Sequence, residues 1–356
     1  MEPTFSGWTI RWGSPMNPVQ STSESNREQI HAAAQLIQAG GLVAFPTETV
    51  YGLGADAFNV DAVRKIFHVK KRPSCDPLIV HVAELDTLRL LVELNDMHRD
   101  AVENLTERFW PGPLTLVLPR RSMVPDVVTA GLPTVAIRMP DHPMALALIR
   151  EADTPLAAPS ANPFGLISPT RAQHVMASLG EQVDCILDGG QCPLGVESTV
   201  LSLVDRQPRL LRAGSISLED LEMVIGPIGH RDDPQHVLSA PGQMARHYAT
   251  RTPLSILPTR GARPSVAPGE QVGLLAFSSF CDTRHYAVVE ILSNSGDLRE
   301  AARNLFAALH RLDAMGLDRL WAEPCLESGV GAAIMDRLRR CAVPESAFTN
   351  NETTTV

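Results

Sequence analysis

The sequence has little lysine, no long apolar run and no recognisable export signal. No segment approaches the roughly 18 consecutive apolar residues of a membrane-spanning helix, so no membrane span is expected. The first 25 residues lack a basic stretch followed by an apolar one, which argues against a secretory signal. We therefore expect a cytoplasmic protein.

The signatures of several enzyme classes are also missing. No lysine follows a glycine, which excludes a P-loop, and no G-x-S-x-G, S-x-x-K or H-E-x-x-H occurs. The six cysteines contain no C-x-x-C, so we expect buried free thiols rather than disulfides or a zinc site. The segment GLGADA is similar to a dinucleotide fingerprint, but TETVY separates it from the preceding strand, so NAD binding is not favoured.

The composition describes an acidic, folded chain. The length of 356 residues suggests two domains, and 44% apolar residues suffice for full cores. The net charge of −9 disfavours general nucleic-acid binding, which depends on cations that neutralise phosphates. The three lysines all lie in one seven-residue window, at Lys65, Lys70 and Lys71. This cluster is either a solvated helix end or part of a phosphate site.

Hydrophobic patterning predicts alternating helices and strands in two units. Helices are expected over 26–39, from the N-cap Asn59 onward, over 142–152 and after Ser217, with short apolar strands between them and a loop over 46–56. Gly, Pro and His then interrupt the pattern before a smaller α/β unit begins. The predicted organisation is an arm (1–25), a first domain (26–226), a linker (227–253), a C-terminal α/β domain (254–345) and a tail (346–356).

Small polar side chains recur at the ends of the predicted strands. In α/β proteins ligands bind where strand ends meet loops. With Lys70, Lys71 and Arg72 these side chains predict a polar, cationic cavity for a phosphorylated nucleotide and a small polar co-substrate. The residues concerned are Thr47, Thr49, His81, Thr134, Arg138, Ser160, Asn162, Ser198, Thr199 and Arg212.

Several segments in order resemble the YrdC-like family. They are PTETVYGLGADA, the KxR of Lys70 to Arg72, DPLIVHV, FWPGPLTLVL, TVAIRMPDH, APSANPFGLISPT, GVESTV and LLRAG. APGQMARHYAT and GVGAAIMDRLRRCA further resemble the two-domain branch, the threonylcarbamoyl-AMP synthases. The resemblance implies a twisted, mixed α/β sheet around a large cationic cavity, with a small Rossmann-like C-terminal domain.

The implied reaction converts L-threonine, bicarbonate and ATP, with Mg²⁺ on the phosphates, into threonylcarbamoyl-AMP and pyrophosphate. A separate tRNA threonylcarbamoyl transferase uses the product for N6-threonylcarbamoyladenosine. The resemblance implies that the catalytic group is Lys70, Arg72, Ser160 and Asn162. ATP would contact Arg72, Asp76, Thr134, Ser160, Ser168, Arg212 and Tyr248. Threonine would contact Thr49, His81, Arg138, Ala158 and Ser198.

Two residues depart from the family pattern. Asp76 replaces an expected asparagine, and its carboxylate would repel phosphates unless a metal or Arg72 compensates. Thr250 replaces a proline at the end of the linker motif. We also expect the linker to cover the cavity through Tyr248 and to exclude water. The alternatives are a carbamoyltransferase that uses carbamoyl-adenylate, an RNA-binding module and a non-catalytic ATP binder.

Overall fold

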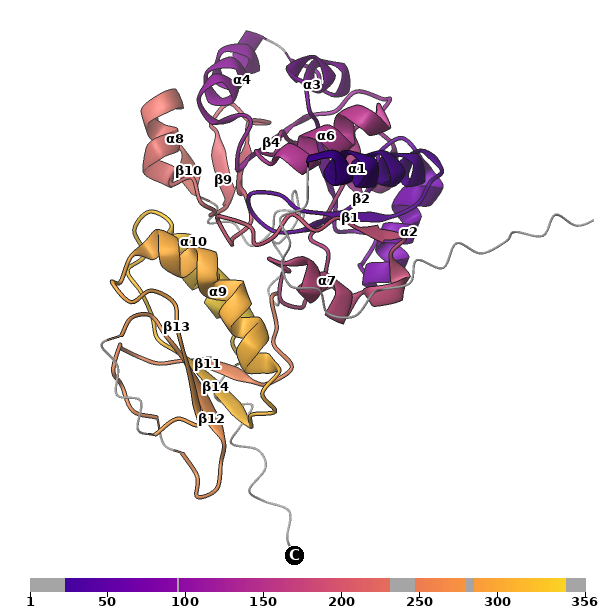
Figure 1. The fold of residues 1–356 in the computed structure, drawn as a ribbon. Helices are drawn as coiled ribbons and strands as arrows, with labels where there is room; N and C mark the ends of the chain where they lie inside the picture. The colour runs from indigo at the N-terminus through magenta and orange to yellow at the C-terminus, as the bar shows by residue number, and fades with distance from the viewer. Residues whose placement is uncertain (1–22, 95, 231–246, 265, 280–284, 344–356) are drawn as a thin grey trace, which may run out of the picture.

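The computed structural model describes residues 23–94, 96–230, 247–264, 266–279 and 285–343. Two α/β units are visible in Figure 1, the larger one formed by the N-terminal part of the chain. Most of the predicted arm and all of the predicted tail lie outside the described residues. Within these ranges, none of the helices combines the length and apolarity needed to cross a bilayer.

The larger unit is built on a ten-stranded mixed sheet, in the order β10-β9-β8-β4-β5-β3-β6-β2-β1-β7. For example, β3 and β5 are parallel whereas β4 and β5 are antiparallel. This confirms the predicted fold class. The strands are β1 (Val43–Phe45), β2 (Gly52–Asp56), β3 (Ile79–His81), β4 (Leu114–Pro119), β5 (Thr134–Arg138), β6 (Leu156–Ala157), β7 (Cys185–Ile186), β8 (Thr199–Ser202), β9 (Arg209–Arg212) and β10 (Gly229–His230).

Eight α-helices and one 3-10 helix accompany this sheet within the described residues, and α1 packs on α6. Both predicted N-caps are confirmed: Asn59 accepts a hydrogen bond from the Ala62 amide, and Ser217 accepts one from Asp220. The helices are α1 (Ser23–Gln38), α2 (Val60–Lys70), α3 (Leu85–Leu91), α4 (Asp96–Phe109), α5 (Asp126–Thr129), α6 (Pro143–Ala152), α7 (Ala172–Ser178), η1 (Gly180–Gln182) and α8 (Leu218–Ile225).

The predicted loop over 46–56 is wrong in its second half, which forms β2 between β1 and β6. The glycines that suggested a loop serve a packing purpose instead. A Cβ at Gly54 would lie 2.7 Å from the Phe45 ring, so the bare backbone lets this ring pack against the strand. The predicted linker also begins inside the large sheet, because Gly229–His230 pairs with β9.

The described cysteines are free thiols, but they are not all buried. Cys192 and Cys341 are buried as predicted, whereas Cys75 is exposed and Cys185 and Cys325 are half-buried. The prediction was wrong for Cys75 because it lies in the turn after α2, beyond the last buried residue of that helix. Cys281 lies outside the described residues.

The smaller unit contains a four-stranded parallel sheet, as the alternating pattern predicted, although β11 was not predicted. Two long helices accompany it, and Figure 1 shows them between this sheet and the larger unit. Its elements are β11 (Leu254–Ile256), β12 (Val272–Ala276), β13 (Val288–Ile291), α9 (Leu298–Asp313), β14 (Arg319–Ala322) and α10 (Gly331–Cys341).

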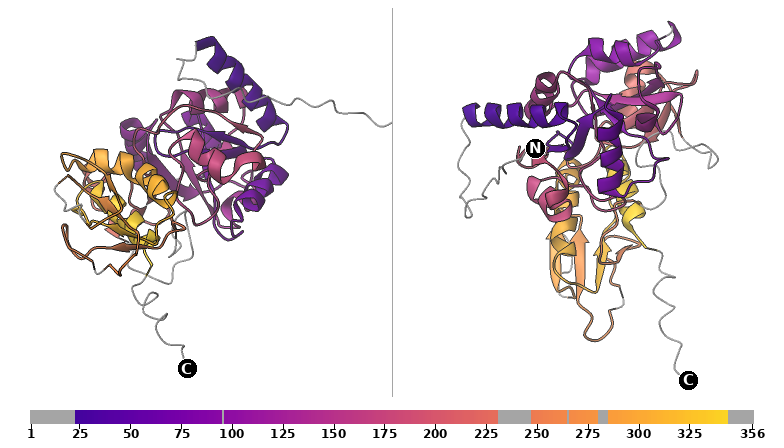
Figure 2. Two further views of the ribbon diagram at one scale, coloured as in Figure 1. Left: turned by 60° about the horizontal axis from the view of Figure 1, so that its bottom comes forward. Right: turned by 90° about the vertical axis from the view of Figure 1, so that its right-hand side faces the viewer.

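The two units are in intimate contact. Gly195 of the larger unit has a φ of +73°, and a Cβ there would lie 2.5 Å from the backbone of Arg303 in α9. One apolar cluster contains Val50 and Val196 of the larger unit together with Phe306 of α9. Because the units share a core, the helices of the smaller unit hold a fixed position beside the loops that precede β2 and β8. Figure 2 shows this arrangement from two further directions.

Candidate active site

A cavity of about 50 Å³ lies at one edge of the large sheet, where β3, β5 and β9 end and β8 begins. Ten of the residues predicted for the cavity line it, namely Thr47, Thr49, Arg72, His81, Arg138, Ala158, Ser160, Ser198, Arg212 and Tyr248. Val50, Gly52, Ile79, Pro159, Glu197 and His247 complete the lining. Strand ends and two loops thus bring together residues that are far apart in the sequence.

The cavity is cationic because three buried arginines face it from different strands and loops. Arg138 ends β5, forms an ion pair with Glu48 at 2.6 Å and donates to the Thr49 hydroxyl at 2.9 Å. Arg212 ends β9 and donates to the carbonyl and the hydroxyl oxygen of Ser198, both at 3.1 Å. Such planar donors suit carboxylate and phosphate ligands.

Arg72, the third arginine, compensates the carboxylate at Asp76. Its Nη2 lies 3.0 Å from Asp76 Oδ1, and its remaining bonds go to the carbonyls of Asp76 and Pro77. Burial raises the pKa of Asp76, while Arg72 and Lys70 oppose this shift. The expected compensation is therefore present, and Asp76 does not line the cavity.

The three lysines are separated in space. Lys65 donates to the Gly40 carbonyl just after α1, and Lys71 is exposed in the left-handed turn that ends α2. Neither lines the cavity, so the phosphate-site interpretation of the whole cluster is wrong. Lys70 is buried, and its ammonium donates to the carbonyls of Ser160, at 2.5 Å, and of Asn162.

Lys70 thus anchors the loop that carries Ser160 into the cavity. Burial lowers the pKa of Lys70, and the nearby charge of Arg72 lowers it further. The Asn162 amide points into the same loop and donates to the carbonyls of Pro163 and Leu166 at 2.9 and 2.8 Å. In this structure Lys70 and Asn162 hold the loop in place and do not line the cavity.

The hydroxyls and the histidine predicted to contact threonine lie around Arg138. The Thr49 hydroxyl is 2.9 Å from that of Thr47, and the Ser198 hydroxyl is 2.7 Å from that of Thr115. His81 is buried at the end of β3, and burial, reinforced by Arg138, lowers its pKa to about 3. The imidazole is therefore uncharged at neutral pH.

Besides Asp76, two further predicted ATP contacts lie outside the cavity lining. Ser168 is buried behind it and donates to Glu197 Oε1 at 2.5 Å. Thr134 begins β5 and shares a strand face with Arg138, four residues further on. Their contacts with ATP stay predictions.

The C-terminal side of the cavity is closed by His247 and Tyr248. Tyr248 has a φ of +66°, an uncommon conformation for a non-glycine residue, and its buried hydroxyl has no hydrogen-bond partner in the part of the chain described. The neighbouring Ala249 amide donates to the Gly165 carbonyl at 2.7 Å. This linker segment therefore lies over the cavity, as predicted for Tyr248.

The sequence interpretation missed several residues that shape the site. Glu48 and Glu197 directly precede the predicted Thr49 and Ser198, so the motifs PTETVYG and GVESTV contained the signal. Arg337, which reaches Glu197 from α10, lies within the motif GVGAAIMDRLRRCA, but this motif gave no reason to place it at the site. Its contribution depends on how the two units pack.

The large mixed sheet, the cationic cavity at its edge and the second α/β unit packed beside it define a two-domain protein of the YrdC-like class. A family model described as "Telomere recombination" matches residues 35–214, and one described as "Threonylcarbamoyl-AMP synthase, C-terminal domain" matches residues 216–343.

Similar proteins span nearly the whole chain. The threonylcarbamoyl-AMP synthase of Pyrococcus abyssi is 43% identical over 88% of this chain and 94% of its own length. That of Bacillus subtilis is 44% identical over 94% of this chain and 98% of its own length. The crystal structure of P. abyssi Sua5 complexed with L-threonine has a TM-score of 0.82 at 42% identity and covers 89% of this chain and 94% of that chain. The chain belongs to the threonylcarbamoyl-AMP synthase family, whose members are adenylyl-transferring enzymes.

Proposed function

We propose that this protein makes L-threonylcarbamoyl-AMP from L-threonine, bicarbonate and ATP and releases pyrophosphate. The observation that carries the proposal is the cavity in which three buried arginines lie among small hydroxyls under the linker residue Tyr248. Family membership over both domains supports it. So does the P. abyssi relative, which was crystallised with L-threonine.

The reaction requires positioning and charge neutralisation rather than a nucleophile from the protein. The threonine amine adds to CO₂ and loses a proton, which gives a carbamate. The CO₂ comes from bicarbonate, which takes up a proton and loses water. A carbamate oxygen then bonds to the α-phosphorus of ATP as the bond to the bridging oxygen breaks, and pyrophosphate leaves. Both reactants are anions, so cationic groups that hold them in line lower the barrier.

The arginines can divide this work by their positions. Arg138, beside Thr49 and His81, suits the threonine carboxylate as a planar donor. Arg72, in the turn after α2, and Arg212, at the end of β9, suit the phosphates, and Lys70 holds the loop that carries Ser160. The uncharged His81 adds no charge to the threonine end.

The size of the cavity implies movement of the linker. Its volume of about 50 Å³ is far below the roughly 300–1,000 Å³ of typical ligand sites. We infer that the segment with His247 and Tyr248 moves aside for ATP and then shields the labile adenylate from water.

Mg²⁺ enters this proposal on the phosphates of ATP. The described residues contain no group of three or more His, Cys, Asp or Glu side chains suited to a metal ion. Glu48 and Glu197 at the site are each paired with an arginine. Mg²⁺ would bind here through phosphate oxygens of ATP and water, as is usual for this ion.

The product would pass to a separate tRNA threonylcarbamoyl transferase, so we place the protein in tRNA processing. The free thiols among the described cysteines support the cytoplasm as its compartment.

The test is pyrophosphate release from ATP with Mg²⁺ and bicarbonate, measured with L-threonine, with L-serine and without an amino acid. Release that depends on L-threonine is expected. Release without threonine would favour the carbamoyltransferase alternative. ATP binding without any release from folded protein would favour the non-catalytic relative.

A further inference from the structure

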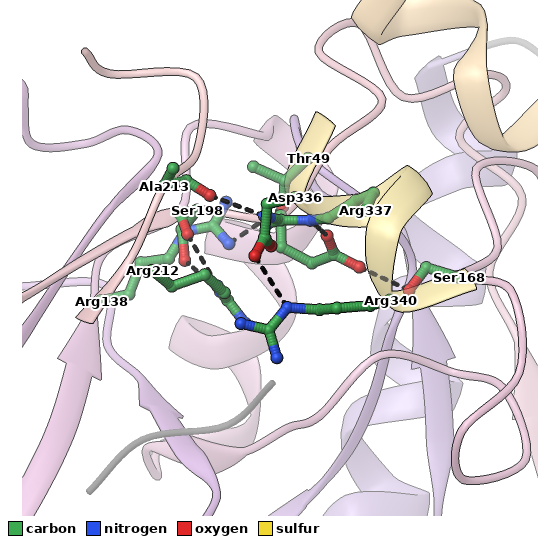
Figure 3. Close-up of polar contacts among 10 residues, drawn as sticks. Thr49, Arg138, Ser168, Ser198, Arg212, Ala213, Asp336, Arg337 and Arg340 are labelled. Atoms are coloured by element: carbon green, nitrogen blue, oxygen red, sulfur yellow. Dashed lines mark hydrogen bonds and ion pairs between the residues drawn. The ribbon is translucent and has the colours of Figure 1, made fainter. Parts of the chain in front are cut away.

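An arginine of the C-terminal domain reaches the wall of the cavity. Arg337 belongs to α10 and is fully buried. Its Nε donates to Glu197 Oε2 at 3.0 Å, and its Nη1 donates to the Ala213 carbonyl and to Asp336 Oδ2, both at 2.8 Å (Figure 3). Its guanidinium also lies 5.3 Å from the centre of the Tyr248 ring.

Glu197, its principal partner, is an acidic residue in a cavity that otherwise presents arginines. Burial alone would raise the pKa of Glu197, but Arg337, Arg212 and the Ser168 hydroxyl together lower it, so the carboxylate stays charged. An unpaired carboxylate at this place would repel a nucleotide phosphate through a medium of low dielectric constant. A cation beside it removes that repulsion.

The same contacts fix two residues of the cavity wall, Ser198 on the threonine side and Arg212 on the phosphate side. Glu197 directly precedes Ser198, and Ala213 directly follows Arg212, so Arg337 holds the neighbours of both. The backbone there is tightly packed, because a Cβ at Gly214 would lie 2.2 Å from the Thr199 amide nitrogen. A shift of either strand end would therefore move the Arg212–Ser198 hydrogen bonds.

We propose that Arg337 is a positioning residue through which the C-terminal domain keeps the cavity cationic, by neutralising Glu197 and fixing the Arg212–Ser198 pair. The proposal rests on the proposed function, since it concerns the same phosphate site. It gives the second domain a part in ATP binding. A variant without Arg337 keeps every residue that lines the cavity, and it should nevertheless bind ATP poorly.

The test is calorimetric titration of the full-length protein with Mg²⁺–ATP in the absence of threonine. The variants are Arg337→Met, Arg337→Lys and the double variant Glu197→Gln/Arg337→Met. Arg339→Met is the matched control, because Arg339 lies on the same helix but pairs with Glu327 at the surface. Thermal unfolding of each variant identifies those that fold.

The expected weakening of ATP binding in Arg337→Met is on the order of tenfold or more, since a buried carboxylate loses its partner. Arg337→Lys keeps the charge but not the fork of donors, so we expect an intermediate affinity. The double variant removes both charges and with them the repulsion, so it should recover most of the lost affinity. The small remaining deficit reflects the missing contact with the Ala213 carbonyl. The control should bind like the wild type.

Wild-type affinity in folded Arg337→Met, or no recovery in the double variant, would overturn the proposal. If Arg337→Met does not fold, the ATP affinity of the double variant tests the proposal. An affinity near that of the wild type supports the proposal, and a tenfold loss of affinity contradicts it. Threonine-dependent pyrophosphate release by the wild type is scored separately. Its absence would refute the proposed function, whereas unchanged ATP binding in the variants would refute only the role of Arg337.

Discussion

Replacing Arg138 should separate the two substrates kinetically. In Arg138→Met the guanidinium that contacts Thr49 and Glu48 is lost, while Arg72 and Arg212 remain. Loss of a buried, charge-assisted contact costs about 2–5 kcal/mol, which corresponds to a weakening of roughly 30-fold to several thousand-fold. We expect this change in the KM for threonine, with a much smaller change in the KM for ATP.

The assay is steady-state pyrophosphate release with one substrate varied while the other is saturating. The substitution also leaves Glu48 buried without its partner, at a cost of about 3–5 kcal/mol in stability. The double variant Glu48→Gln/Arg138→Met removes the buried, unpaired carboxylate and serves as the folding control. Equal increases in both KM values, or an unchanged KM for threonine in folded protein, would refute the assignment of Arg138 to the threonine carboxylate.

Four further predictions concern the loop, the acidic substitution, the second domain and pH. Lys70→Met should lower turnover at least about tenfold, because the loop with Ser160 loses its anchor; unchanged turnover would make this contact dispensable. Asp76→Asn should tighten ATP binding in calorimetry, because Arg72 is freed from its carboxylate; weaker binding in folded protein would contradict this. A chain that ends at residue 226 should be inactive in the pyrophosphate assay, since it lacks Tyr248, and full activity would argue against the lid. Burial lowers the pKa of His247 from 6.5 to about 3 in the folded protein. Between these pH values the His247 imidazole takes up a proton in the unfolded chain but not in the folded one, so the free energy of unfolding falls as the pH falls. In His247→Gln the free energy of unfolding, measured by urea denaturation, should depend less steeply on pH between 3 and 6.5, by up to about 1.4 kcal/mol per pH unit. An unchanged slope would show that the pKa of His247 is the same in the folded and the unfolded chain.

Local signals in the sequence predicted most of the elements. The caps Asn59 and Ser217 each accept a hydrogen bond from an amide three residues further on, so the sequence contains the whole interaction. Residues 52–56 were misinterpreted because the reason for the glycines is the ring of Phe45, which only the folded sheet brings near. The strand β11 was missed for a similar reason, since it is stabilised by pairing with β14, more than 60 residues further on.

The sequence predicted which residues line the site better than it predicted how their side chains pair. The strand-end residues, supported by the family motifs, do meet at one cavity. The charge pairing did not follow from the sequence, because Glu48 and Glu197 gain their partners through side-chain directions. Arg337 belonged to a recognised motif, but its place at the site did not follow from it, because that place arises from the packing of α10 against the large sheet.

The central claim is that this chain joins threonine, CO₂ and AMP into one molecule. The most direct measurement supplies ¹³C-bicarbonate, ATP, Mg²⁺ and L-threonine to the purified protein and analyses the nucleotide product by mass spectrometry. We expect an adenylate that contains both threonine and the ¹³C atom, absent when threonine is replaced by serine. Pyrophosphate release without such an adenylate, or an adenylate without the label, would contradict the account.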